Sequence, residues 1–289
     1  MIRSGIIAGL VVMLCWGVAD FLQSIPIRKI GTPKTMFVRN ILTLILVAFM
    51  GIYLFPDDRL SISVENLSIL CISALIYVWG YYMFMRGFEV GTVALVSPIA
   101  GSFSIITVIL ALIFFQESLP FQKLAAVLVM IVGVFLTSTD ISKIKSIQSQ
   151  NGLKEALLAM LCFGVSFFIL GFVSKKMNPL NIFFFVSLSQ ALFFVVLSVM
   201  KNGLITKADI NGRLLVIFII HSLIVNMGWL VYIFGVGKDL VSLVTPISAL
   251  FPGVTVLLAL IFYKERLVSN QKLGIFSILV SVFLISISD

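Results

Sequence analysis

The stretch Val93–Asp140 reads VALVSPIAGSFSIITVILALIFFQESLPFQKLAAVLVMIVGVFLTSTD, and it recurs as Val241–Asp289, VSLVTPISALFPGVTVLLALIFYKERLVSNQKLGIFSILVSVFLISISD. With Pro98 placed on Pro246, 15 of the 27 positions from 93 to 119 are identical in the two copies without a gap. Each copy is an apolar segment, a short charged turn and a second apolar segment. The chain therefore contains an internal duplication of a hydrophobic unit.

The composition indicates a membrane protein. Hydrophobic residues make up 61% of the 289 residues and charged residues 11%, whereas about a quarter of the residues of an ordinary soluble domain are charged. A chain this apolar cannot cover its surface for water, so we expect the lipid bilayer as its main surrounding. The net charge of +8 comes from basic residues that lie in short loops without a patch, so no nucleic-acid partner is expected.

Ten segments are apolar enough to cross the bilayer, which takes roughly 20 residues for about 30 Å of hydrocarbon. They are 4–27, 33–54, 66–88, 92–115, 121–139, 152–173, 179–200, 213–235, 240–263 and 270–288. We interpret the first as a retained span, because it is longer than a signal-peptide core and has a counterpart later in the chain. The longest polar gap, 140–151, divides the spans into two sets of five.

The first spans of the two sets also match. Residues 13–18, MLCWGV, align with 160–165, MLCFGV, at an offset of 147. An odd number of spans per unit makes the second copy enter from the opposite face, which is the inverted repeat that secondary transporters use to form a midplane site. We predict an all-α integral membrane protein with ten transmembrane helices in two inverted five-helix repeats. The halves are 1–140 and 152–289, joined by a loop at 141–151.

The motifs shared by the two halves resemble those of a known family. They are Trp16-Gly17, Val96-Ser97-Pro98, Phe114-Phe115-Gln116-Glu117, Gln122 and Gly133, repeated as Phe163-Gly164, Val244-Thr245-Pro246, Tyr263-Lys264-Glu265 and Gln271. Over essentially its full length the chain resembles the EamA-type module of the drug/metabolite transporter superfamily, departing at Ser281, where the first half has Gly133. The resemblance implies a transporter with spans one to four and six to nine around a central cavity. It is nearly silent on substrate, because related proteins move amino acids, sugars, nucleotide sugars and drugs.

Two charged residues, Asp20 and Arg39, fall within hydrocarbon depth. Each lies roughly 9–12 Å from the same membrane edge, one on either side of the turn between the first two spans. Because charge inside a membrane is costly, such residues mark a functional site by default. We expect an ion pair across this helical hairpin, serving either a substrate or proton site or helix packing alone; snorkelling of Arg39 to the interface is a further alternative. Phe167 occupies the Asp20 position in the second half, so the role of the pair is asymmetric.

Aromatic residues with a polar atom gather in the third and eighth spans. Tyr77, Trp79 and Trp229 are predicted to line a mostly apolar pocket with a few polar anchors, with helix packing as the alternative. Tyr81 and Tyr82 are close enough to a helix end to belong to an interfacial aromatic belt.

Other polar residues lie inside the eighth, fourth and ninth spans. His221, near Asn226, is interpreted first as a neutral imidazole bonded to a neighbouring helix, since a proton-coupled role needs a pKa near ambient pH. Ser97 and Thr245 each precede a proline, which frees a backbone carbonyl and permits bending. Hydroxyls at such places serve either a ligand or the packing of small residues between helices.

The predicted substrate-binding set is Trp16, Asp20, Arg39, Tyr77, Trp79, Ser97, His221, Asn226, Trp229 and Thr245. We predict no catalytic residues, no metal site and no cofactor. The sequence has no Gly-rich phosphate loop, no HExxH and no GxSxG, so we do not expect an enzyme.

We therefore expect a secondary active transporter of a small organic metabolite, with an amino acid or related zwitterion as first candidate. It would act by alternating access in the cell (plasma) membrane. The alternative is a non-transporting receptor or scaffold, which has no need of an inverted duplication. The expected partners are a small-molecule substrate and the lipid bilayer; a homodimer and a coupling ion such as the proton are left open.

The membrane orientation is left open by two conflicting observations. Short loops on the face that bears both termini hold six Lys and Arg, and those on the opposite face hold thirteen. The positive-inside rule then places the termini outside, whereas ten-helix relatives usually keep both termini in the cytoplasm.

Overall fold

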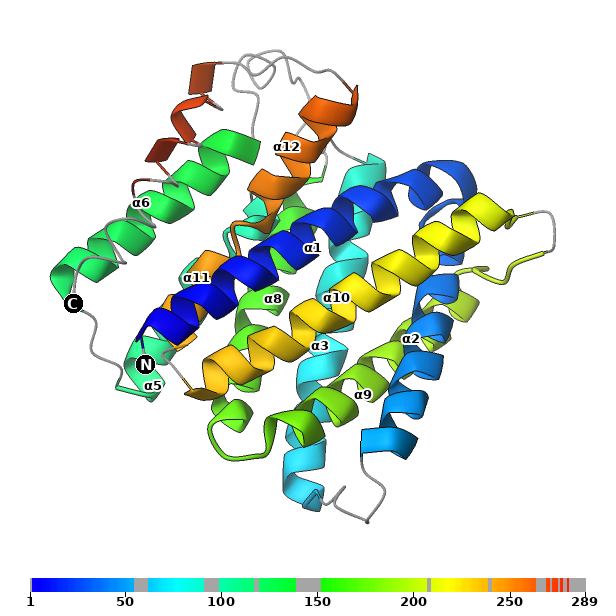
Figure 1. Ribbon diagram of the computed structural model, residues 1–289, viewed down its shortest axis with the longest axis horizontal. Helices are drawn as coiled ribbons and strands as arrows, with labels where there is room; N and C mark the ends of the chain where they lie inside the picture. The colour runs from blue at the N-terminus through cyan, green and yellow to red at the C-terminus, as the bar shows by residue number, and fades with distance from the viewer. Residues whose placement is uncertain are drawn as a thin grey trace.

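The computed structural model describes residues 2–54, 62–90, 99–116, 120–138, 152–206, 209–238, 241–263, 269, 270, 272–274, 276, 277 and 280. All regular elements within these residues are helices (Figure 1). They are α1 (Ile2–Ile30), α2 (Thr32–Leu54), α3 (Val64–Val90), α5 (Phe103–Phe114), α6 (Phe121–Ser138), α8 (Leu153–Ser174), α9 (Pro179–Met200), α10 (Gly212–Lys238), α11 (Val241–Ser248) and α12 (Phe251–Tyr263).

Six of these helices are long and apolar enough to cross a membrane, namely α1, α2, α3, α8, α9 and α10. They correspond to the predicted spans at 4–27, 33–54, 66–88, 152–173, 179–200 and 213–235. Proline starts α9, where its missing N–H costs nothing, and the Asn178 side chain accepts a hydrogen bond from the Leu180 amide as the cap. Most of the predicted span 270–288 lies outside the described residues.

The predicted ninth span is not one helix. α11 ends at Ser248 and α12 begins at Phe251, with a turn at Ala249 and Leu250. Because Pro252 has no N–H to donate to the carbonyl of Ser248, the regular α-helical hydrogen bonding is interrupted at this point. The Leu250 amide bonds the carbonyl three residues before it, at 3.2 Å. The fourth span has a turn at the corresponding place, residue 102, just before α5 begins.

Helix contacts between the two halves come in matched pairs. The packing of α3 on α8 is matched by that of α10 on α1, and α5 on α8 is matched by α11 and α12 on α1. Likewise α3 on α9 is matched by α10 on α2, while α2 and α9 contact each other. Exchanging the halves therefore reproduces the contact pattern of the bundle.

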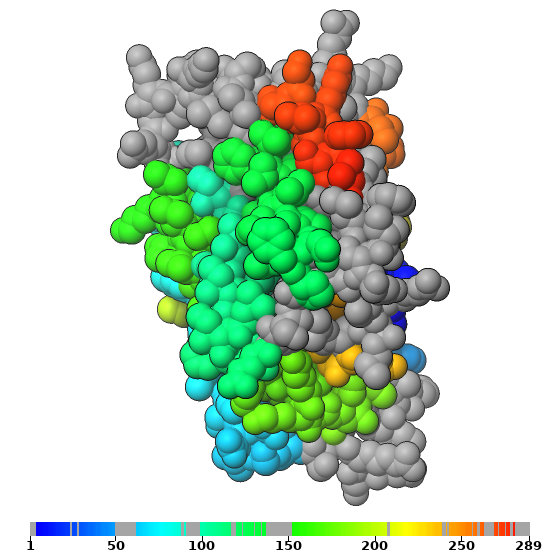
Figure 2. Space-filling model, turned by 90° about the vertical axis from the view of Figure 1, so that its left-hand side faces the viewer, coloured from blue at the N-terminus to red at the C-terminus, as the bar shows by residue number. Residues whose placement is uncertain are grey.

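The neighbouring helices α1 and α10 run in opposite directions (Figure 1). α6 contacts α11 and α12, and together with α5 it is seen on the outer surface in Figure 2. The largest buried core cluster joins α1, α3, α8, α9 and α10. The candidate site lies among these helices.

Candidate substrate site

A cavity of about 80 Å³, counted as the space that the centres of water-sized spheres can occupy, lies between the two halves. At roughly 10–15 Å³ per water on this measure, it has room for several waters or one small molecule. Its polar lining residues are Asp20, Arg39, Asn40, Thr43, Ser187, Gln190, His221 and Asn226. Its aromatic lining residues are Trp16, Tyr77, Tyr81, Phe84, Phe103, Phe163, Phe167, Phe194, Trp229 and Phe251. The cavity thus combines apolar walls with a few polar groups, as small-molecule sites do.

Arg39 on α2 is buried and held by neutral partners. Its Nη1 donates to Gln23 Oε1 at 2.6 Å and to the Tyr81 hydroxyl at 2.9 Å. Gln23 Nε2 also donates to the Tyr81 hydroxyl, which closes a triangle between α1, α2 and α3. The guanidinium carbon lies 4.8 Å from the ring centre of Tyr81 and 5.0 Å from that of Phe194. Hydrogen bonds and cation–π contacts together fix the position of this positive charge.

Asp20 lines the same cavity, but it is not paired with Arg39. Within the described residues its carboxylate makes no hydrogen bond, and no ion pair joins it to Arg39 within 4.0 Å. The direct ion pair expected from the sequence is therefore wrong, because Gln23, one turn further along α1, takes the guanidinium together with Tyr81. Two opposite charges instead line the same cavity.

The predicted aromatic residues separate into two groups. Trp16, Tyr77 and Trp229 meet at the cavity, with ring centres 5.2 Å apart for Trp16–Trp229 and for Tyr77–Trp229. Trp79 is 49% exposed and contacts the ring of Tyr82, and it does not line the cavity. The expectation that Trp79 faces the cavity is wrong because it lies two residues from Tyr77 on one helix, which turns it to the opposite face.

The polar residues of α10 also lie at the cavity. His221 is 2% exposed, and its Nδ1 has no hydrogen-bond partner in the described structure. The imidazole was expected to bond a neighbouring helix, and within the described residues Nδ1 makes no such bond. Asn226 Nδ2 donates to the Ser222 carbonyl at 2.7 Å and to Thr43 Oγ1 at 3.3 Å, which links α10 to α2.

One predicted residue lies away from the cavity. Thr245 is fully buried, and its hydroxyl lies 2.8 Å from that of Tyr232, away from the cavity lining. This contact joins α10 to α11. Ser97 lies outside the described residues. No group of three or more potential metal ligands occurs in the part of the chain that the structure describes.

The sequence analysis missed several residues at the site. Tyr81 was assigned to an interfacial belt, yet it is buried and bonded to Arg39. Its position four residues after Tyr77 on the same helix was the available signal. Thr43 likewise follows Arg39 by four residues on α2, so the same spacing could have identified it. Gln190 and Phe194 on α9 could not be identified in this way, because the span 179–200 contains no charged residue whose depth in the membrane could be estimated.

Residues 3–139 and 151–287 each match the EamA-like transporter family. The chain belongs to that family. It is thus a multi-pass integral membrane protein, and family membership implies a transporter rather than an enzyme.

Relatives agree with a transporter built from two similar units. An "uncharacterized transporter" of Archaeoglobus fulgidus is 20% identical over 281 residues, which cover 97% of each chain. An uncharacterized protein of Methanocaldococcus jannaschii is 33% identical over 134 residues, 46% of this chain and 94% of that protein. That relative therefore has about the length of one half. A solved crystal structure matches with a TM-score of 0.75 at 13% identity, covering 98% of this chain and 97% of that one, and it supports the fold alone.

Proposed function

We propose that this protein is a secondary active transporter that moves a small zwitterionic metabolite, such as an amino acid, across the plasma membrane by alternating access. The observation that carries the proposal is the cavity wall on which a carboxylate without a hydrogen bond, Asp20, and a fixed guanidinium, Arg39, face the same space. A zwitterion carries both complementary charges within a few bonds.

The two charged side chains have distinct tasks in this proposal. The Asp20 carboxylate accepts hydrogen bonds from the substrate ammonium group, which replaces the water lost on entry. Arg39 has five N–H donors, and its contacts to Gln23 and Tyr81 use Nη1. Its other donors are available for the substrate carboxylate. The aromatic wall formed by Trp16, Trp229 and neighbouring rings takes the apolar part of the substrate.

The directions of the helices support a further part of this proposal, namely ten transmembrane spans in two inverted repeats. α10 corresponds to α3 in the repeat, and α1 and α3 run in the same direction if each helix crosses the membrane. Parallel repeats would then make α1 and α10 parallel, whereas they run in opposite directions (Figure 1). An axis in the membrane plane accounts for this, and it places the cavity near the midplane. The turns before α5 and between α11 and α12 are the places where each half bends.

Uptake by the purified protein in liposomes, screened over pools of amino acids, tests the proposal. Asp20→Asn should reduce uptake of the substrate about 10–100-fold, the scale of one charge-assisted hydrogen bond of about 1.5–3 kcal/mol. Its thermal stability should change little, because the carboxylate makes no hydrogen bond in the described structure. Glu65→Gln, an exposed acid at the start of α3, is the matched control.

The double variant Asp20→Asn with Arg39→Gln separates transport from packing. If the two charges act on the substrate, the double variant remains folded but fails to transport. Uptake at the wild-type rate in a stable double variant would contradict the proposed role of both residues.

A further inference from the structure

A second cavity lies along the same helices as the first. It measures about 210 Å³ by the same definition, against about 80 Å³ for the substrate cavity. We call it the vestibule. Its lining includes Thr32 and Met36 of α2, Tyr82 and Arg86 of α3, and Ser198 and Lys201 at the end of α9.

The vestibule lies between the substrate cavity and one membrane face. On α2, Thr32 and Met36 precede Arg39 and Asn40, so the vestibule is nearer to the helix start. On α9 the vestibule residue Lys201 follows the helix end, ten residues beyond the cavity residue Ala191. At 1.5 Å per residue this separation is roughly 15 Å along the helix. The two cavities are therefore stacked between α2, α3 and α9.

One layer of side chains separates the two cavities. Arg39, Tyr81 and Phe194 all line the substrate cavity, and each lies within three residues of a vestibule residue on its own helix. The guanidinium packs on both rings, whose centres are 5.4 Å apart. We call Arg39, Tyr81 and Phe194 the gate layer. Because Gln23 and Tyr81 also bond the guanidinium, the layer is held shut by specific contacts.

The vestibule is positively charged. Arg86 is 50% exposed and its Nε lies 4.0 Å from Glu155 Oε1, a distance at which the carboxylate neutralises it only in part. Lys201 Nζ lies 5.4 Å from the ring centre of Tyr82. Lys34, at the rim, is already paired with Asp209 at 2.7 Å. Arg86 and Lys201 are thus the cations left to attract an anion.

The repeat provides an internal comparison for these cations. At an offset of 148, Phe234 on α10 occupies the position of Arg86 on α3, and Leu230 that of Tyr82. A charged vestibule is therefore not a requirement of the repeated fold. Its presence on one side of the molecule indicates a function of that side.

We propose that the vestibule is an entry site that binds the carboxylate of the substrate, and that the gate layer controls its passage to the substrate cavity. The carboxylate binds first to Arg86 and Lys201. It then reaches Arg39 and binds the N–H groups that Gln23 and Tyr81 do not use, and this new contact draws the guanidinium away from Gln23 and Tyr81 and so loosens the layer. The identity of the ligand rests on the proposed function, whereas the location and charge of the entry site do not.

Labelling of engineered cysteines tests the entry site without requiring transport. In a background with Cys15→Ala, Cys71→Ala and Cys162→Ala, Leu197→Cys places a thiol in the vestibule wall. In liposomes of neutral phosphatidylcholine, an anionic membrane-impermeant thiosulfonate should label it from one face only. Adding Arg86→Gln and Lys201→Gln should slow that labelling about tenfold, the lower end of electrostatic focusing in a cleft. A cationic thiosulfonate should not be slowed.

A matched control removes a charge outside the vestibule. Arg213→Gln at the start of α10 lies on the same face and should leave both labelling rates unchanged. Labelling that ignores reagent charge, or that proceeds equally from both faces, would overturn the entry site. Protection of Leu197→Cys by millimolar amino acid supports a soluble carboxylate as ligand. Protection by anionic phospholipid in the liposomes instead would overturn that assignment in favour of a lipid headgroup.

The gate layer has its own test. Gln190→Cys places a thiol in the substrate cavity, beyond the layer. Phe194→Ala should speed its labelling from the vestibule face, and Tyr81→Phe, which keeps the ring but removes the hydroxyl bonded to Arg39, should do so to a smaller extent. Unchanged labelling in the folded Tyr81→Phe protein would overturn the gate. Charge-selective labelling without uptake of any amino acid would retain the entry site and reject the proposed function.

Discussion

In the first half Gly17 of α1 lies against α12, and in the second half Gly164 of α8 lies against α5 in the same way. A Cβ added to Gly17 would lie 2.4 Å from Val254 Cβ, and one added to Gly164 would lie 2.6 Å from Ile106 Cβ. These helices therefore approach as closely as their backbones allow. A hydroxyl from the facing helix bonds the glycine carbonyl in both places, at 3.1 Å and 3.0 Å.

Unlike these helix crossings, the lining of the cavity differs between the two halves. At the same offset of 147, Asp20 corresponds to Phe167 and Gln23 to Leu170, so these two polar residues have apolar counterparts. Tyr81 corresponds to Trp229 at an offset of 148, and both line the cavity. The repeated contacts set the shape of the bundle, and the residues that differ make the cavity lining asymmetric. This comparison predicts which substitutions act alike in the two halves.

The largest expected effect is on folding. Gly17→Ala and Gly164→Ala should each destabilise the protein by about 1–3 kcal/mol through overpacking, with Gly17→Ala the more severe because its Cβ would have the closer contacts. The midpoint of thermal unfolding in detergent measures both. Gly212→Ala is the control, because a Cβ there meets no atom within 4 Å. A Gly17→Ala protein as stable as Gly212→Ala would show that the close crossing is not required.

Much of the fold could be predicted from the sequence because duplication and apolar length are local signals. Six predicted spans became long helices, and the family model matches two ranges, 3–139 and 151–287. The break between α11 and α12 was not predicted, since hydropathy is unaffected by a turn inside an apolar segment. The turn, in which the Leu250 amide bonds the carbonyl of Ile247, becomes visible only in the backbone.

Less of the site could be predicted, because its geometry depends on side-chain directions. The predicted depth of Asp20 and Arg39 in the membrane was enough to predict that they lie close together, and both line one cavity. Their partners depend on which side chains of α3 point towards them. The rotation of α3 about its axis turns Tyr81 towards Arg39 and Trp79 away from the cavity. Here the uncharged acceptor Gln23 takes the Arg39 donor that was expected to pair with Asp20.

A smaller effect is expected at the hydroxyls of the same crossings. Thr107→Val and Thr255→Val each remove a hydrogen bond to a glycine carbonyl of the other half and should cost about 0.5–1.5 kcal/mol. Thr107→Val should cost more, because Thr107 is fully buried and Thr255 is only partly so. Ser68→Ala, whose hydroxyl bonds a carbonyl of its own helix, is the control for unfolding midpoints. If only one of the two threonine substitutions lowers the unfolding midpoint, the two crossings are not equivalent.

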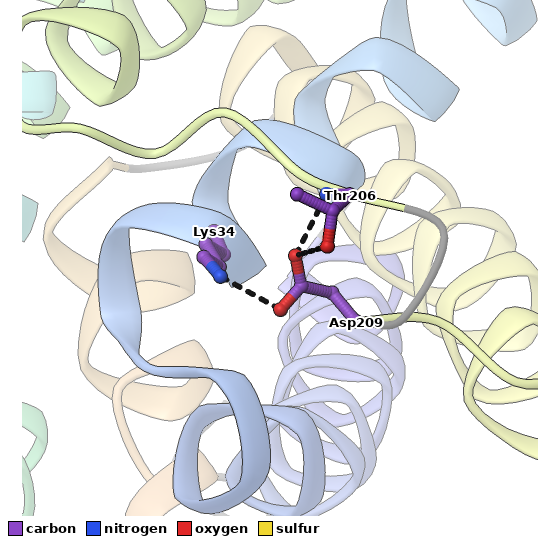
Figure 3. A network of polar contacts seen from close by, with 3 residues as sticks. All are labelled: Lys34, Thr206 and Asp209. Atoms are coloured by element: carbon purple, nitrogen blue, oxygen red, sulfur yellow. Dashed lines mark hydrogen bonds and ion pairs between the residues drawn. The ribbon is translucent and has the colours of Figure 1, made fainter.

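The smallest effect concerns a contact between the halves at the vestibule rim. Asp209, in the loop between α9 and α10, pairs with Lys34 of α2 at 2.7 Å and accepts hydrogen bonds from the Thr206 amide and hydroxyl at 2.7 Å and 2.9 Å (Figure 3). The Lys34 hydrogen bond, followed by those from Thr206, lowers the pKa of Asp209 from 3.8 to about 2. At the offset of 147, Asn181 stands at the position of Lys34 in the second half, so this pair is not repeated.

A lowered pKa means that the folded protein favours the ionised carboxylate, so this pair stabilises the fold above about pH 4. The stabilisation should decline as the pH falls from 3.8 towards 2, where the carboxylate becomes protonated in the folded state as well. Asp209→Asn should therefore lower the unfolding midpoint slightly at neutral pH, and its difference from the unmodified protein should disappear near pH 2. Lys34→Gln should have a smaller effect, since Asp209 keeps its bonds from Thr206, and adding it to Asp209→Asn should change little, because Lys34 acts through Asp209. A difference that persists unchanged at low pH would show that Asp209 acts through the shape of the loop rather than through its charge.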